Sequence, residues 1–329
     1  MRLTIRAVGI WLRPIAIDLV MVAAFGALLL ALSVAYGTHL TWMQSSVLLP
    51  LASLLVLLGL AVGARVRDAL RGAAGEWRLA VAESLAILRD WLPLTMVLLV
   101  YENLHEYTYL LRPTTLDADL RGLDELLFGV EPTLLLDRVT SPWLTEVMTA
   151  AYGLYFVYPA GLLIALYATG HRRLYRELGL ALSAACYLGF LGYVTVPAMG
   201  PRYFIAAEFH HALTGPWLTA RAAAAWNHLE SVQRDCFPSL HTGLTTIFLT
   251  FLWRARRLWP RGRLVLGACT PLVVALWVST IYLRYHWTVD VLAGWTLGLL
   301  VSALAPVLLR WYGGDAVERR TVAGGEPAG

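Results

Sequence analysis

Apolar residues are gathered into long runs along this chain, and short polar segments separate the runs. Each run approaches the roughly 20 apolar residues that an α-helix needs to cross a bilayer. We predict eight such helices, at 15–36, 47–64, 91–111, 143–169, 178–197, 239–253, 264–283 and 287–309. The pattern therefore predicts an all-α polytopic membrane protein.

The composition agrees with this prediction, since 58% of the residues are hydrophobic, more than soluble domains usually contain. The first run is too long for the apolar region of a signal peptide and is interpreted as a retained anchor. We predict two transmembrane helices and an Arg-rich cytoplasmic linker in 1–90, with residues 65–90 forming an interfacial helix. A six-helix core follows in 91–312, and 313–329 form a disordered cytoplasmic tail.

All 26 basic residues are arginine. With both chain ends in the cytoplasm, 19 arginines lie inside and 7 outside, as the positive-inside rule requires. The outer segments are then 37–46, 112–141, 198–238 and 284–286. The sequence has no basic patch with interleaved aromatic residues, so nucleic-acid binding is not predicted.

The outer segment 112–141 contains leucines at helical spacing with acidic residues between them. Leu116, Leu120, Leu123 and Leu127 recur at this spacing, with Asp117, Asp119, Arg121 and Asp124 between them. This pattern predicts an amphipathic helix that lies on the outer membrane interface. It is either a plain connector or a lid over a site that faces outward.

Two polar groups stand where apolar runs meet the outer side. His286 and Asp290 have the i, i+4 spacing that places two side chains on one helix face. Asp290 can then accept a hydrogen bond from one ring nitrogen and leave the other as nucleophile or base. The alternative is a purely structural ion pair.

The second group is Pro238-Ser239-Leu240-His241, which is typical of a helix start. It places His241 in the first turn of the sixth predicted helix, where free N–H groups and the helix dipole attract phosphate. Arg202 and Arg284 flank these motifs and suit phosphate oxygens. Arg112 and Arg234 are weaker candidates of the same kind.

Three ionisable residues share one face of the third predicted helix, namely Glu102, His105 and Glu106. Such groups at membrane depth are usually functional. They could pair structurally with Arg112, line a head-group pocket or bind a metal. Cys236 has no obvious partner, no zinc-binding spacing exists, and the paired His210-His211 is expected to be solvated.

Pro-Ser-Leu-His followed by His-x-x-x-Asp resembles the second and third signature motifs of the type 2 phosphatidic acid phosphatase superfamily. Over 91–310, Gly200-Pro201-Arg202-Tyr203, the run from Tyr282 to Asp290, and Asp124 with Phe128-Gly129 and Pro132 resemble the inositol phosphorylceramide synthase branch. The family's first-motif lysine is missing, and its third-motif Ser-Arg reads Ser279-Thr280. Arg202 and Arg284 are the nearest substitutes.

The resemblance implies that His286 is the nucleophile, Asp290 its orienting carboxylate and His241 the general acid. Ser239, Arg202, Arg284 and Tyr203 would bind the phosphate, without a metal or another cofactor. We expect a lipid phosphoryl or phospho-head-group transferase in the cell membrane, with membrane lipids as partners and an extracytoplasmic site. A lipid phosphate phosphatase is the alternative, and a transporter a remote one, because no internal repeat is found.

Overall fold

The computed structural model describes residues 17–38, 59, 63, 76–229 and 233–311. The second predicted helix, 47–64, lies almost wholly outside the described residues, as do 65–75 of the predicted linker and the predicted tail 313–329. The described residues contain helices and no β-strand; an isolated parallel bridge joins Ala198 to Asp235. The predicted all-α class is therefore confirmed.

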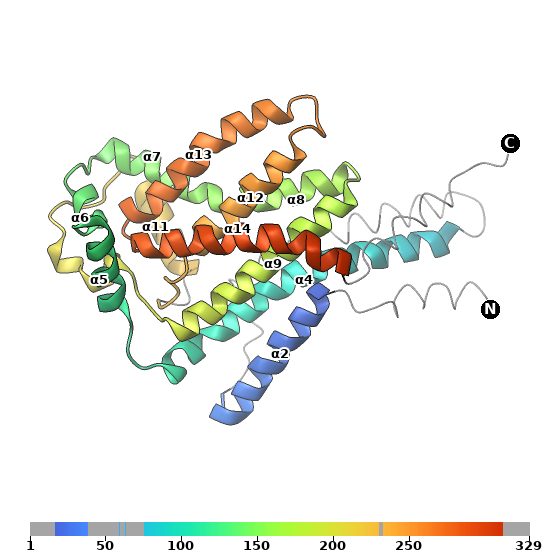
Figure 1. The fold of residues 1–329 in the computed structure, drawn as a ribbon, viewed down its shortest axis with the longest axis horizontal. Helices are drawn as coiled ribbons and strands as arrows, with labels where there is room; N and C mark the ends of the chain where they lie inside the picture. Colours follow the sequence, from blue (N-terminus) through green and yellow to red (C-terminus); the bar gives the residue numbers. More distant parts are fainter. Residues whose placement is uncertain (1–16, 39–58, 60–62, 64–75, 230–232, 312–329) are drawn as a thin grey trace. The chain divides into compact units, whose positions relative to one another are not determined.

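The helices follow one another along the whole described chain (Figure 1). In order they are α2 (Ile17–Tyr36), α4 (Glu76–Leu111), α5 (Asp117–Phe128), α6 (Pro132–Asp137), α7 (Pro142–Gly153), η1 (Leu154–Phe156), α8 (Tyr158–Ala168), α9 (Arg172–Thr195), α10 (Pro201–Phe204), η2 (Ala206–Glu208), α11 (Thr219–Leu229), α12 (Leu240–Ala255), α13 (Gly262–Tyr282) and α14 (Thr288–Trp311).

Within the described residues, 5 helical segments are long and apolar enough to cross a membrane. They are Ile17–Tyr36, Pro142–Ala168, Arg172–Thr195, Gly262–Tyr282 and Thr288–Trp311. Each coincides with a predicted span. The predicted span 239–253 becomes α12, which has only 16 residues, and 91–111 forms the second part of α4. Residues 76–90, part of the predicted linker, are continuous with this span in the single 36-residue helix.

The chain divides into two compact units. The first contains residues 1–103 and 308–329, and its described part consists of α2, most of α4 and the end of α14. The second contains residues 104–307 and carries all the motifs at 198–290. In this second unit α13 packs against α7 and α12, and α12 also packs against α8 and α9.

Small residues let α12 and α14 approach until their backbones touch. A Cβ built on Gly294 would lie 2.3 Å from the Ser239 carbonyl oxygen, and one on Gly298 would lie 2.5 Å from the Gly243 carbonyl oxygen. Close approach of this kind is typical of helix pairs in membranes. It brings the first turn of α12 beside the first turn of α14, where the two histidine motifs lie.

Candidate active site

His286 lies in the tight turn between α13 and α14. Its backbone N–H and that of Tyr285 both donate to the Thr280 carbonyl oxygen, at 3.2 and 3.0 Å. Arg284 takes a left-handed conformation, with φ 67°, which a non-glycine residue adopts rarely. The i, i+4 spacing predicted that His286 and Asp290 share one helix face. This prediction is wrong, because α14 begins at Thr288 and His286 therefore precedes the helix.

Asp290 lies in the first turn of α14 and is fully buried. Its Oδ2 accepts a hydrogen bond from the Trp287 backbone N–H at 2.8 Å. The same oxygen is 3.6 Å from Nδ1 of His286, which is beyond ordinary hydrogen-bond length for N–H···O. The two side chains are neighbours, as predicted, but the carboxylate does not hold the imidazole by a direct hydrogen bond.

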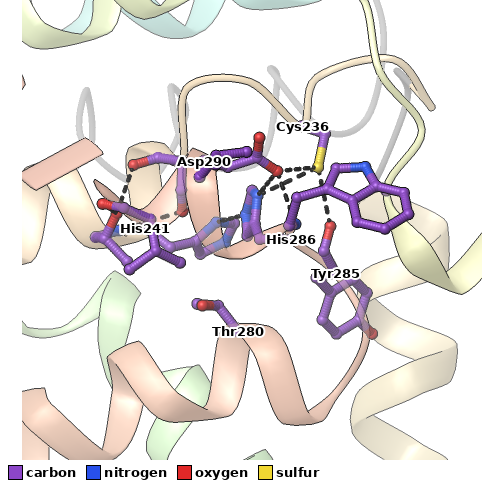
Figure 2. A network of polar contacts seen from close by, with 12 residues as sticks. Cys236, His241, Thr280, Tyr285, His286 and Asp290 are labelled. Atoms are coloured by element: carbon purple, nitrogen blue, oxygen red, sulfur yellow. Dashed lines mark hydrogen bonds and ion pairs between the residues drawn. The ribbon is translucent and has the colours of Figure 1, made fainter. Parts of the chain in front are cut away.

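His241 and His286 contact each other at the start of α12 (Figure 2). Nδ1 of His241 lies 3.2 Å from Nε2 of His286. Ser239 caps α12 by accepting from the Thr242 N–H at 3.4 Å, and its own N–H donates to the Asp290 carbonyl oxygen at 3.1 Å. These backbone contacts fix the two helix starts relative to each other, and with them the two histidines.

Two tyrosines complete the surroundings of His241. The Tyr152 hydroxyl lies 2.7 Å from Nε2 of His241, and the Tyr155 ring centroid lies 4.4 Å from that of His241. Tyr152 lies in the last turn of α7, and Tyr155 lies in η1, which joins α7 to α8. The sequence analysis missed them, because tyrosines in an apolar run carry no motif.

Cys236 is a further residue of this cluster that the sequence did not indicate. The prediction that it has no partner is wrong, because its Sγ lies 2.8 Å from Oδ2 of Asp290, 3.4 Å from Nδ1 of His286 and 3.2 Å from the Tyr285 carbonyl oxygen. Figure 2 shows the sulfur directed at these groups. Cys236, His286 and Asp290 are also a set of donors within 4.8 Å of one another that could hold a metal ion.

Arg202 lies beside the turn between α13 and α14 that carries His286. Its N–H donates to the Arg284 carbonyl oxygen at 2.7 Å, and its Nη1 donates to the Tyr285 hydroxyl at 3.1 Å. The guanidinium also lies 5.5 Å from the Tyr203 ring centroid. The structure thus brings the Gly-Pro-Arg-Tyr motif to the histidine turn, as a shared phosphate-binding role requires.

The Arg284 side chain is engaged elsewhere. It donates to Oδ1 of Asp137 at 2.8 Å and to the His211 carbonyl oxygen, and it stacks on Phe209 at 3.9 Å. Asp137 also accepts from the backbone N–H groups of His210 and His211 and from the His211 ring. Burial alone would raise the pKa of Asp137, but these hydrogen bonds and the Arg284 charge hold it below its usual range.

His210 and His211 were expected to be solvated, and the structure corrects that expectation in part. Both rings are exposed, yet the two backbones and the His211 ring bind Asp137.

Three carboxylates of segment 117–137 bind the backbone and side chains of segments around the histidine turn. We call Asp117, Asp124 and Asp137 the acidic strap. Asp117 accepts from the N–H groups of Met199 and Gly200 and from the Trp287 indole at 3.0 Å. Asp124 accepts from the backbone N–H groups of Thr288 and Val289. The predicted helix is present as α5, with Asp117 and Asp124 buried beside Leu120 and Asp119 exposed.

The remaining predicted residues do not join this cluster through any contact that the described residues show. Glu102 is buried, and its Oε2 has no hydrogen-bond partner among them. The side chains of His105 and Glu106 lie outside the described residues. Arg112 donates to the Thr195 carbonyl oxygen at 2.8 Å, and its own carbonyl accepts from Nη1 of Arg234. Both arginines thus connect backbone segments.

A family model, PAP2 superfamily, matches residues 120–304. This match covers more than half of the chain and contains both histidine motifs, the Gly-Pro-Arg-Tyr segment and most of the acidic strap.

The chain belongs to the PAP2 superfamily.

Members of the PAP2 superfamily are phosphatases or phosphotransferases of membranes, so the general class expected from the motifs is confirmed. No curated protein and no solved structure matches the chain. The five apolar helices agree with a membrane location for this PAP2 protein.

Proposed function

We propose that this PAP2 protein transfers a phosphoryl or phospho-head group from a membrane lipid through a phosphohistidine on His286. The observation that carries the proposal is the 3.2 Å contact between Nε2 of His286 and Nδ1 of His241, at the first turn of α12. A nucleophile and a proton-transfer group at hydrogen-bond distance are the parts that covalent catalysis requires.

The hydrogen bonds support a definite assignment of protons. We assign the Tyr152 hydroxyl as the donor in its 2.7 Å contact with Nε2 of His241, and this choice places the proton of neutral His241 on Nδ1. That proton points at Nε2 of His286, which then has a free lone pair. This is the nitrogen available for attack on phosphorus once the substrate phosphate separates the two rings.

The reaction then has two balanced halves. Nε2 of His286 forms a bond to phosphorus while the bond to the leaving oxygen breaks. His241 enters this step as an imidazolium, with a second proton taken up when the phosphate binds, gives its Nδ1 proton to the leaving oxygen and is left neutral. In the second half His241 takes a proton from the acceptor hydroxyl, whose oxygen attacks phosphorus and releases His286. If the acceptor is water, the product is free phosphate or a phosphomonoester. If it is a lipid or polyol hydroxyl, the head group moves to a new lipid.

The phosphate would lie at the positive end of α12, with Ser239, Arg202 and Tyr203 around it. Arg202 is the stronger cationic candidate, because Arg284 is already paired with Asp137. The arginine distribution along the sequence supports an extracytoplasmic site. The resemblance to inositol phosphorylceramide synthases favours transfer over hydrolysis, and a lipid phosphate phosphatase is the second candidate, since the superfamily contains both classes.

The test is to follow a radiolabelled phosphate. Detergent-solubilised protein is incubated with labelled lipid phosphates and inositol phospholipids, with and without ceramide or diacylglycerol, beside a His286→Ala control. Label that appears on a new lipid only when acceptor is present supports the transferase. Free phosphate lost in the variant identifies a phosphatase. Equal label distribution for wild type and variant on every substrate rejects the site.

A further inference from the structure

Cys236 occupies the gap between His286 and Asp290. The residue is 4% exposed and follows the bridge between Ala198 and Asp235, with its N–H bound to the Ala198 carbonyl oxygen. Gly200 lies behind it, where even a Cβ would come within 3.1 Å of the sulfur. The thiol is therefore packed against the catalytic turn with little freedom to move.

The three distances in this gap show which contacts are made. Sγ to Oδ2 of Asp290 is 2.8 Å and Sγ to Nδ1 of His286 is 3.4 Å, whereas Nδ1 to Oδ2 is 3.6 Å. Sulfur is the larger atom and tolerates longer hydrogen bonds than oxygen. The thiol is thus in contact with both groups, which are too far apart to bond each other directly.

The direction of each bond follows from the chemistry of the partners. A carboxylate only accepts, so the S–H donates to Asp290, whose charge and shorter distance favour it over the neutral Tyr285 carbonyl. The sulfur lone pairs then accept the Nδ1 proton of His286. A proton on Nδ1 leaves Nε2 free, as attack on phosphorus requires.

A bound metal ion is the competing explanation for Cys236, His286 and Asp290. Sulfur and oxygen ligands of a tetrahedral zinc would lie roughly 3.5 Å apart, given usual bond lengths. Sγ and Oδ2 are 2.8 Å apart, a separation that suits a hydrogen bond better.

We infer that Cys236 is a positioning residue that links Asp290 to His286 and holds the imidazole in its nucleophilic tautomer. This inference rests on the proposed function, in which His286 attacks through Nε2. Asp290 then acts on His286 through the thiol as well as across the 3.6 Å separation of Oδ2 and Nδ1.

The kinetic test compares substitutions that separate hydrogen bonding from packing. Cys236→Ala and Cys236→Val remove the donor, and Val fills the space; Cys236→Ser keeps a group that both donates and accepts. We expect Ala and Val to lower kcat about 100-fold with KM within about twofold, as a misplaced nucleophile does, and Ser to recover most of kcat. Cys186→Ala, at a buried thiol of α9, is the matched control.

Several results would overturn the inference. A near-normal kcat for Cys236→Val would show that the thiol only fills space. A kcat for Cys236→Ser as low as that of Cys236→Ala would exclude a hydrogen-bond role. Loss of activity with EDTA and recovery with zinc would establish the metal site instead. Thermal unfolding of each variant shows whether lost activity is merely lost fold.

A spectroscopic measurement keeps the inference testable without activity. The infrared S–H stretching band of Cys236, isolated by subtracting the Cys236→Ala spectrum, reports the strength of the thiol's hydrogen bond. In Asp290→Ala it should move to higher wavenumber, because the neutral Tyr285 carbonyl is a weaker acceptor than the carboxylate. An unmoved band rejects the link. If the wild type is inactive on every substrate but the Cys236 band still moves in Asp290→Ala, the proposed function is rejected and the link between Cys236 and Asp290 is retained.

Discussion

The most direct structural prediction concerns Asp124→Ala. Asp124 is fully buried, and its two oxygens accept from the backbone N–H groups of Thr288 and Val289 at 2.6 and 2.8 Å. These are the first two residues of α14, whose N–H groups have no partner inside their own helix. The side chain therefore caps α14 from a different segment of the chain, two residues after His286.

The magnitude follows from the two amides that lose their acceptor. A buried donor left without a partner costs about 1–3 kcal/mol, and loss of a capping side chain costs about 0.5–2 kcal/mol. Because both amides lie at one helix end and the effects overlap, we expect Asp124→Ala to lower the free energy of unfolding by about 2–4 kcal/mol. Asp124→Asn keeps one acceptor oxygen and should cost about half as much.

The assay is equilibrium unfolding in mixed detergent micelles, with kcat measured on the same preparations. The matched control is Asp119→Ala, since Asp119 is exposed on the same helix and its loss should change the free energy of unfolding by less than about 0.5 kcal/mol. We also expect kcat to fall in the Asp124 variants, because the turn that carries His286 loses its anchor. Equal unfolding of Asp124→Ala and Asp119→Ala would refute the reasoning.

Three further predictions concern catalysis, pH and phosphate binding. His241→Asn should lower kcat at least about 100-fold in the labelled-phosphate assay, since it removes the proton-transfer group; a loss under threefold would contradict that role. Burial raises the pKa of Glu131 to about 7, above its unfolded value. The folded protein therefore keeps this proton while the unfolded chain releases it, and stability falls as pH rises from about 4.5 to 7. The melting temperature of the wild type should drop more than that of Glu131→Gln between pH 5 and pH 8, and parallel curves would count against this assignment. Arg202→Lys should raise KM for the lipid phosphate about tenfold by removing a planar, bidentate donor, whereas Arg221→Lys, at an exposed position of α11, should leave KM unchanged.

The sequence was sufficient to predict the helices and the histidines for a physical reason. A membrane span must be apolar over its whole length, so His241, His286 and Asp290 stand out at helix ends where ionisable groups are costly. The spans matched by α2, α9, α13 and α14 follow directly from that constraint. Proline and serine before His241 likewise predict the start of α12.

The contacts made by Cys236, Tyr152 and the acidic strap could not be predicted in the same way. A thiol or a phenol in an apolar run is ordinary, and Cys236 meets its partners through contacts distant in the sequence, with its N–H on the Ala198 carbonyl oxygen and its sulfur beside Asp290. The leucine spacing in 112–141 predicted an amphipathic helix correctly. It did not reveal that Asp117 and Asp124 are buried beside Leu120, because the spacing places them on one helix face without showing the backbone amides that they meet.

The orientation of α5 leaves apolar side chains outside and two carboxylates inside, so the surroundings of this helix bear on the candidate site. Its carboxylates bind the turn that carries His286, while Leu123, Leu126, Leu127 and Phe128 are exposed, Leu126 at 78%. In water such a helix would gain by rotating its leucines inward, and that rotation would withdraw Asp117 and Asp124 from the amides that they bind. Hydrocarbon removes this incentive. With α5 on the outer membrane interface, as its sequence predicts, lipid around the exposed leucines would favour the orientation that keeps Asp117 and Asp124 on these amides. The proposed activity would then depend on lipid composition without any change in the active-site residues.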